Sequence, residues 1–105
     1  MSKDALDKLA AVIKARRNAT PEDSYTKQLL ADPTKPAKKV GEEGVEVAIA
    51  ALVQDKAALV SETADLLYHL LVLLESRDVT LDEVRDELER RMGETDEKRR
   101  KAASV

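Results

Sequence analysis

Residues 59–74 read LVSETADLLYHLLVLL, the most apolar stretch of the chain, and we expect it to lie in a helix over about 56–76. A helix this apolar should be largely enclosed by other helices. Its only formal charges are Glu62 and Asp65, with His69 one turn beyond. Because these residues are three and four apart, all three project from one side of the helix. An ionised carboxylate removed from water is costly unless a cation or donors compensate it, so something positive should face that side.

The chain before this helix contains two further helical patterns. An apolar face with i, i+3, i+4, i+7 spacing predicts a helix over about 4–17. That face consists of Leu6, Leu9, Ala10 and Ile13. A polar segment follows, in which Thr20 and Pro21 are placed as the N-cap and first helical residue. A short helix is expected over about 25–30, before a break at Asp32-Pro33.

The helix immediately before the apolar one should begin near Pro36, with Thr34 as its cap, and end near residues 54–55. Gly41 and Gly44 lie inside it, where each costs up to about 1 kcal/mol relative to alanine. Glycine at such positions often allows another backbone or a ligand to come close.

The last helix should begin at Thr80, which forms a capping box with Glu83, and end at Gly93. Its apolar stripe consists of Leu81, Val84, Leu88 and Met92. With no credible strand and no internal repeat, the fold class is all-α, a bundle of four to five helices.

The length of 105 residues suits one domain, which we place at residues 1–93, followed by a disordered basic tail over 94–105. A domain this small buries only about 60–70% of its unfolded surface, so we expect a second copy of the chain to cover part of its apolar surface. The chain has no cysteine and one histidine, which excludes a disulfide framework and argues against a structural zinc site.

Charge and hydropathy patterns indicate a cytoplasmic protein with no membrane span. Charges interrupt the N-terminus too often for a signal peptide, and the longest uncharged run, over 66–74, is too short to cross a bilayer. The net charge of −3 gives no general attraction to nucleic acid. The basic cluster Lys98-Arg99-Arg100-Lys101 is the one exception, and it is short and has no aromatic residues interleaved.

Carboxylates on the two central helices form the main candidate site. Glu43 and Glu46 repeat the three-residue spacing of Glu62 and Asp65, and Glu42 lies one turn before Glu46. If the two helices pack as an antiparallel pair, both acid pairs could face each other and would repel strongly. A hard divalent cation, Mg²⁺ or Mn²⁺, would resolve that conflict. The alternative is that the acids are structural and pair with arginines, for instance Arg16, Arg17 or Arg77.

Neighbouring residues also have a simple structural interpretation beside a functional one. His69 alone is more often a hydrogen-bonded core residue than a catalytic group, and Tyr68 is expected to serve packing. Lys38 and Lys39 are most simply solvent-facing charges, although beside a metal they could neutralise phosphate. No P-loop pattern includes Gly41 or Gly44, so phosphates would have to be held by metal and lysines.

The whole pattern resembles the phosphoribosyl-ATP pyrophosphohydrolases of histidine biosynthesis, within the all-α, MazG-like nucleoside-triphosphate pyrophosphohydrolases. The superfamily motif E-E-x-x-E followed by E-x-x-D is present at residues 42–46 and 62–65. The narrower family motifs are SYT at 24–26, KVGEE at 39–43 and SETADLLYHLLVLL at 61–74. The resemblance covers about residues 6–91.

This resemblance implies Mg²⁺-dependent hydrolysis of phosphoribosyl-ATP to phosphoribosyl-AMP and pyrophosphate, in a cytoplasmic homodimer whose helices complete the site. Carried over by position, the implied metal ligands are Glu43, Glu46, Glu62 and Asp65. Glu42 is implied as a further ligand or as the group that activates water, and Glu43 also has a catalytic role. The implied substrate contacts are Lys38, Lys39, Tyr25, Thr26 and His69. Association with the next enzyme of the pathway is a further implication.

Two other functions are compatible with parts of the pattern. A housekeeping pyrophosphohydrolase acting on free or damaged nucleotides would need the same metal site. A helical dimer acting as a scaffold would pair the acids with arginines and bind no metal.

Overall fold

The computed structural model describes residues 4–93, and this part of the chain contains helices, turns and no strand. The elements in order are α1 (Ala5–Ala15), the short 3₁₀ helix η1 (Arg16–Asn18), α2 (Tyr25–Ala31), α3 (Thr34–Val53), α4 (Lys56–Ser76) and α5 (Leu81–Met92). The prediction of an all-α fold is therefore confirmed. The predicted tail over 94–105 lies outside the described residues.

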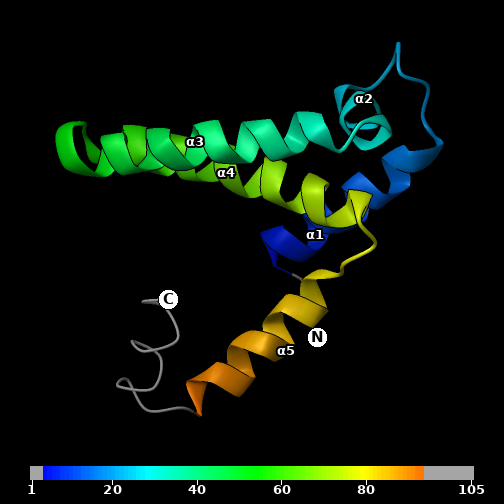
Figure 1. Cartoon of the computed structure of the whole chain (residues 1–105). Coiled ribbons are helices and arrows are strands. Elements are labelled where there is room, and N and C mark those ends of the chain that lie inside the picture. The colour runs from blue at the N-terminus through cyan, green and yellow to red at the C-terminus, as the bar shows by residue number, and fades with distance from the viewer. Residues whose placement is uncertain (1–3, 94–105) are drawn as a thin grey trace.

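Helices α3 and α4 form a long antiparallel hairpin, which is the dominant feature of the fold (Figure 1). The turn between them is short because α3 ends at Val53 and Asp55 already caps α4, its side chain accepting a hydrogen bond from the Ala58 amide at 2.9 Å. Helices α1 and α2 pack against α4. The antiparallel arrangement on which the carboxylate hypothesis depended is thus present.

The hydrophobic core lies around the C-terminal half of α4. Its buried members are Ile13 of α1, Leu29 of α2, and Leu71 and Val72 of α4. Partly buried side chains surround them: Leu6, Leu9, Leu30, Tyr68, Leu74 and Leu81. The core thus lies where helices α1, α2 and α4 meet.

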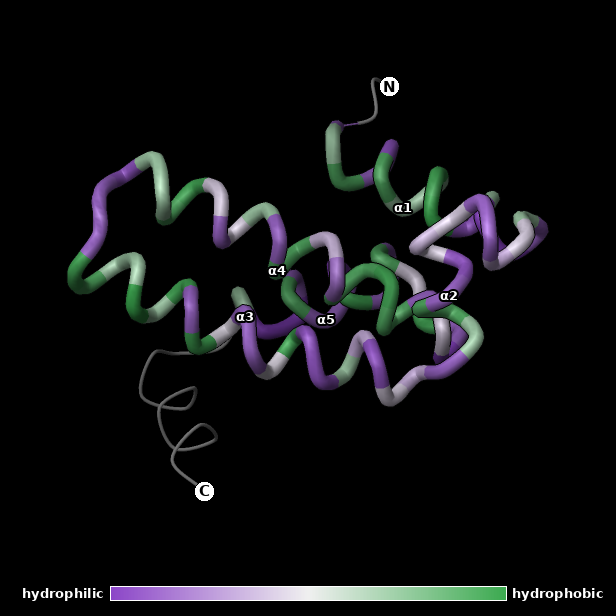
Figure 2. The backbone as a smooth tube through the Cα atoms, turned by 90° about the horizontal axis from the view of Figure 1, so that it is seen from above, coloured by the Kyte–Doolittle hydropathy of each residue, from purple (hydrophilic) through white to green (hydrophobic). Residues whose placement is uncertain are grey.

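The prediction that other helices largely enclose the apolar stretch is wrong within a single chain. At the free end of the hairpin, Leu52 is 84% exposed and Val60 is 61% exposed. Figure 2 shows hydrophobic residues recurring along both helices toward this end. No described element reaches across the outer part of the hairpin, so its apolar side chains have only the other hairpin helix to pack against.

The predicted cap at Thr20 is wrong. Residues 21–23 form a turn, and the Thr20 hydroxyl donates a 2.7 Å hydrogen bond to the Asp23 carboxylate. Ser24 is the N-cap instead, because its hydroxyl accepts a hydrogen bond from the Lys27 amide at 3.1 Å. The short helix predicted over 25–30 is confirmed as α2.

The start of α3 also differs from the prediction. Thr34 is the first helical residue and not the cap, since the Asp32 carboxylate accepts hydrogen bonds from both the Thr34 amide (3.1 Å) and the Thr34 hydroxyl (2.7 Å). Space for a Cβ exists at both Gly41 and Gly44, with no atom of residues 4–93 within 4 Å. The close approach that these glycines could permit is therefore not made by the described chain.

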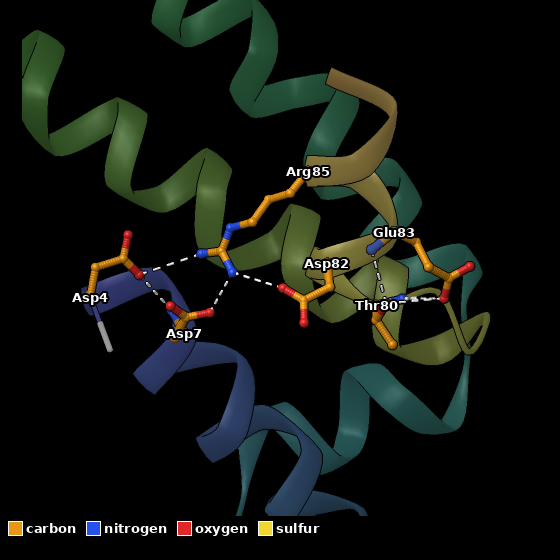
Figure 3. Close-up of polar contacts among 6 residues, drawn as sticks. All are labelled: Asp4, Asp7, Thr80, Asp82, Glu83 and Arg85. Atoms are coloured by element: carbon orange, nitrogen blue, oxygen red, sulfur yellow. Dashed lines mark hydrogen bonds and ion pairs between the residues drawn. The ribbon is translucent and has the colours of Figure 1, made fainter. Parts of the chain in front are cut away.

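Helix α5 begins with the predicted capping box of Thr80 and Glu83 and runs away from the hairpin (Figure 1). An ionic cluster ties it to α1, in which Arg85 contacts Asp7 (2.6 Å), Asp82 (3.0 Å) and Asp4 (3.6 Å), as Figure 3 shows. The hydrogen bond from Arg85 lowers the pKa of Asp7. Polar contacts therefore orient α5 relative to the rest of the chain.

One helix, α4, is long and apolar enough to cross a membrane by length and composition, with a mean hydropathy of 1.5 over an 18-residue window. The uncharged run at residues 66–74, which is too short to cross a bilayer, is only part of this helix. However, α4 carries Glu62 and Asp65 near its middle and contributes Leu71 and Val72 to the core. Core helices of globular proteins commonly pass the same test.

Candidate active site

Four carboxylates from the hairpin lie near one another: Glu43 and Glu46 on α3, and Glu62 and Asp65 on α4. We call this set the carboxylate site. Glu43, whose side chain is 12% exposed, and Glu62 are partly buried, whereas Glu46 and Asp65 are exposed. The arrangement follows from the antiparallel packing, which sets the middle of α4 beside the middle of α3. The sequence placed Asp65 on the same side as Glu62, but the structure leaves it at the solvent-exposed edge.

The electrostatics of Glu62 show how close these acids are. The pKa of Glu62 is raised, first by a hydrogen bond with Glu46 that only a protonated carboxyl can make, and next by burial. The charges of Glu46, Asp65 and Glu43 raise this pKa further. Like charges thus converge at the hairpin, and no Lys or Arg of residues 4–93 forms an ion pair with them, which is the conflict predicted from the sequence.

Two carboxylate oxygens of the site are buried without any hydrogen-bond partner among residues 4–93: Glu43 Oε1 and Glu62 Oε2. Unpaired buried oxygens are costly, and native proteins usually satisfy them. Hard oxygen ligands with no thiolate suit Mg²⁺ or Mn²⁺. The donor set therefore fits such an ion, although no group of three His, Asp or Glu side chains in the described chain is already gathered around one point.

The structural alternative was that arginines pair with these acids, but Arg17 and Arg85 pair with other acids. Arg17 contacts the Glu75 carboxylate and pairs with Asp78 at 3.0 Å, and Arg85 pairs with aspartates of α1 and α5. Glu75 and Asp78 lie beyond the carboxylate site along the chain. Within residues 4–93, the ion pairs of Arg17 and Arg85 thus join elements without involving any acid of the carboxylate site.

His69 connects the carboxylate site to α2. It is 8% exposed, and its Nδ1 donates to the Asp65 carbonyl oxygen at 3.1 Å. Glu43 Oε1 lies 2.5 Å from the same nitrogen, but the ring N–H points toward the carbonyl, so Glu43 Oε1 accepts no well-aligned hydrogen bond. With the proton on Nδ1, Nε2 accepts from the Tyr25 hydroxyl at 3.2 Å. The histidine is therefore held on both nitrogens.

Tyr68 does more than pack, contrary to the expectation from sequence. Its hydroxyl forms a 2.5 Å hydrogen bond with the Thr26 hydroxyl, and its ring meets the His69 ring edge-on with centroids 4.8 Å apart. The Tyr25 ring stacks on Tyr68 at 6.5 Å. The residues Tyr25 and Thr26 of the SYT motif are thus fixed against α4 by side chains of α4.

Two cavities lie along the hairpin. Six of the predicted site residues line them, whereas the other four line neither: Glu43, Asp65, Thr26 and His69. The first, of about 260 Å³, is lined by Glu46, Ile49, Gln54 and Glu62. The second, of about 390 Å³, is lined by Tyr25, Gln28, Leu29, Lys35, Lys38, Lys39 and Glu42. We call the second cavity the lysine pocket. Glu42 therefore lies with the lysines and not with the other carboxylates.

Sequence reasoning missed three of the polar residues that line these cavities: Gln28, Lys35 and Gln54. Lys35 could have been found, because it lies one turn before Lys39 and so shares its face of α3. Nothing in the sequence distinguished Gln28 or Gln54 from other polar surface residues.

Comparison with known proteins gives consistent matches over nearly the whole chain. The family model described as phosphoribosyl-ATP pyrophosphohydrolase matches residues 6–92. A phosphoribosyl-ATP pyrophosphatase of Rhodobacter capsulatus is 57% identical over 90 residues, covering 85% of this chain and 87% of that protein. Proteins of the same name from Cereibacter sphaeroides (57% over 89 residues, 84% and 86% covered) and Caulobacter vibrioides (52% over 90 residues, 86% and 84% covered) are similarly close.

Proposed function

The chain belongs to the phosphoribosyl-ATP pyrophosphohydrolase family, and on that premise we propose that it hydrolyses phosphoribosyl-ATP to phosphoribosyl-AMP and pyrophosphate, a step of histidine biosynthesis, with Mg²⁺. The name that the relatives share, phosphoribosyl-ATP pyrophosphatase, supports the substrate and the class of reaction. The metal, the products and the site residues are our own proposal. A cytoplasmic location and an association with the next enzyme of the pathway remain predictions.

The observation that carries the metal site is the pair of buried, unpartnered oxygens, Glu43 Oε1 and Glu62 Oε2, among converging acids. The ligands would be Glu43, Glu46, Glu62 and Asp65. When bound, Mg²⁺ supplies compensation for the negative charge of the polyphosphate. Mn²⁺ would be a possible substitute, since the same oxygen ligands suit both ions.

The chain's own residues would orient substrate and water. Glu43 lies beside His69, and its carboxylate is a candidate base for an attacking water, which must come within about 3 Å of it. Glu42, the other candidate base, lines the lysine pocket and is exposed. His69 would keep Glu43 in place, because the ring is itself anchored by the Asp65 carbonyl and Tyr25.

We further propose that the functional unit is a homodimer in which a second copy covers the outer part of the hairpin. The hairpin carries a set of exposed apolar side chains: Val45, Ile49, Leu52, Val53 and Val60. These residues lie on the same two helices as the carboxylate site, so a second copy packed there would also help to exclude water from it. Size-exclusion chromatography with light scattering should give twice the monomer mass of 11.6 kDa.

The experiment that tests the function is pyrophosphate release from phosphoribosyl-ATP with and without Mg²⁺, beside a panel of ordinary nucleoside triphosphates. Metal-dependent turnover confined to phosphoribosyl-ATP is the expected result. Turnover of the panel instead would indicate a housekeeping pyrophosphohydrolase. No turnover of any substrate would favour a scaffold and contradict the proposal.

A further inference from the structure

The lysine pocket is distinct from the carboxylate site. None of Glu43, Glu46, Glu62 and Asp65 lines it, whereas three lysines from successive turns of α3 do. Lys35, Lys38 and Lys39 bring three positive charges, against the single carboxylate of Glu42 in the lining. The pocket of about 390 Å³ is large enough for a phosphate-bearing group.

The three ammonium groups are available to a ligand. Within residues 4–93, no hydrogen bond or ion pair involves the side-chain nitrogen of Lys35, Lys38 or Lys39. Asp32 is a further acid near Lys35: hydrogen bonds from Thr34 are the main cause of its lowered pKa, and the charge of Lys35 is a smaller one. However, the Asp32 carboxylate is already held by Thr34. A cluster of unpaired lysines beside one acid favours an anion.

The proposed substrate has two anionic ends, because phosphoribosyl-ATP carries a triphosphate and also the phosphate of a second ribose. Two anionic ends call for two separate sites, and the structure offers two. Along α3, Lys39 is four residues from Glu43 and seven from Glu46, about 6 and 10 Å at the helical rise, and Lys35 is eleven residues from Glu46, about 16 Å. A ligand with a purine and sugars between its charged groups can span the longer of these separations.

We propose that the lysine pocket binds the phosphate of the phosphoribosyl group, with Lys35 and Lys39 as the residues that distinguish phosphoribosyl-ATP from ATP. The inference rests on the proposed function and adds the residues that select the substrate. Tyr25 links the two regions, since it lines the pocket and its hydroxyl bonds His69 beside Glu43. Gln28, on α2, adds an amide to the lining of the pocket.

The kinetic test compares Lys35→Gln and Lys39→Gln with wild type, using phosphoribosyl-ATP and ATP as substrates in Mg²⁺. Each variant removes one charge-assisted hydrogen bond and should lower kcat/KM for phosphoribosyl-ATP about 10-fold relative to kcat/KM for ATP, mainly through KM. Lys35→Arg should restore most of the loss because it keeps the charge. Lys8→Gln, which removes an exposed lysine of α1, is the matched control and should behave as wild type.

A binding test without metal separates this proposal from the proposed function. Ribose 5-phosphate carries only the phosphoribosyl end, and calorimetry in the presence of EDTA should show that it binds wild type and binds the Lys35→Gln/Lys39→Gln variant about 10-fold or more weakly. Wild type that binds in this lysine-dependent way but does not hydrolyse phosphoribosyl-ATP would support the pocket and contradict the enzyme assignment.

Two results would overturn the assignment of the pocket. In the first, the lysine variants lose as much kcat/KM with ATP as with phosphoribosyl-ATP, which would mean that the lysines bind the triphosphate. In the second, ribose 5-phosphate binds wild type and the double variant equally, or binds neither.

Discussion

Replacing Glu43 by glutamine tests the carboxylate site most directly. The amide keeps the size of the side chain and removes one negative charge from a group of four acids. Glu43 Oε1 accepts no well-aligned hydrogen bond, although it lies 2.5 Å from His69 Nδ1. We therefore expect the Glu43→Gln variant to fold, with a Tm in the absence of metal equal to or higher than that of wild type.

The magnitude of the metal effect follows from binding to the folded state alone. At a free Mg²⁺ concentration 100 times the Kd, a ligand stabilises the folded state by about 2.7 kcal/mol. In a domain of this size, about 1 kcal/mol shifts the Tm by 4–8 °C, so Mg²⁺ should raise the wild-type Tm by roughly 10–20 °C. Removing a ligand should abolish most of this rise. Turnover should fall at least about 100-fold, because the metal contributes several kcal/mol and each 1.4 kcal/mol is a factor of ten.

The assay is a thermal melt at a series of Mg²⁺ concentrations, together with pyrophosphate release. Glu89→Gln is the matched control, since this exposed glutamate of α5 lies outside both cavities. Its melting behaviour and turnover should equal those of wild type. If the Glu43→Gln variant keeps both the full Mg²⁺-induced rise in Tm and near-normal turnover, Glu43 is not a metal ligand and the reasoning from unpaired oxygens is refuted.

Three further perturbations test other parts of the fold. Ile13→Ala should lower the free energy of unfolding by about 2–5 kcal/mol, measured by urea titration, because Ile13 is 1% exposed in the core; a loss below 1 kcal/mol would contradict that placement. Hydrogen bonds from Arg90 and then Arg91 lower the pKa of Glu87 to about 2. The contribution of Glu87 to the free energy of unfolding is therefore fully present above pH 4.5 and should be lost as the pH falls toward 2. In thermal melts over this pH range, Glu87→Gln should remove this part of the pH dependence of the Tm. Deletion after Gly93 should leave most turnover, since the family match ends at residue 92; an inactive but folded truncation would assign the tail a role.

Local signals in the sequence determined the helices well. The boundaries of α4 and the start of α5 agree with prediction because they depend on nearby residues: Asp55 and Thr80 cap their own helices. The errors at Thr20 and Thr34 have a local cause as well. In each case a neighbouring residue, Ser24 or Asp32, supplied the capping oxygen, and propensity alone does not decide between adjacent polar candidates.

The sequence also identified the acids of the site, because Glu62 and Asp65 interrupt an apolar helix and their spacing recurs on the preceding helix. It could not say which of them are buried. That depends on the rotation of α3 and α4 about their axes in the hairpin, which turns Glu43 and Glu62 toward the interior and leaves Glu46 and Asp65 exposed.

Periodicity and capping by themselves therefore determined the helical class, the extent of the central helices and the set of candidate acids, since these depend on contacts within a few residues. The division into a carboxylate site and a lysine pocket was decided only by the tertiary structure. Lys38, Lys39 and Glu42 lie close to Glu43 in sequence, yet with α2 packed against α3 and α4 they line a separate, solvent-exposed pocket with Tyr25. Residues adjacent along a helix point in directions about 100° apart, so only the position of the neighbouring helices determines which of them share a site.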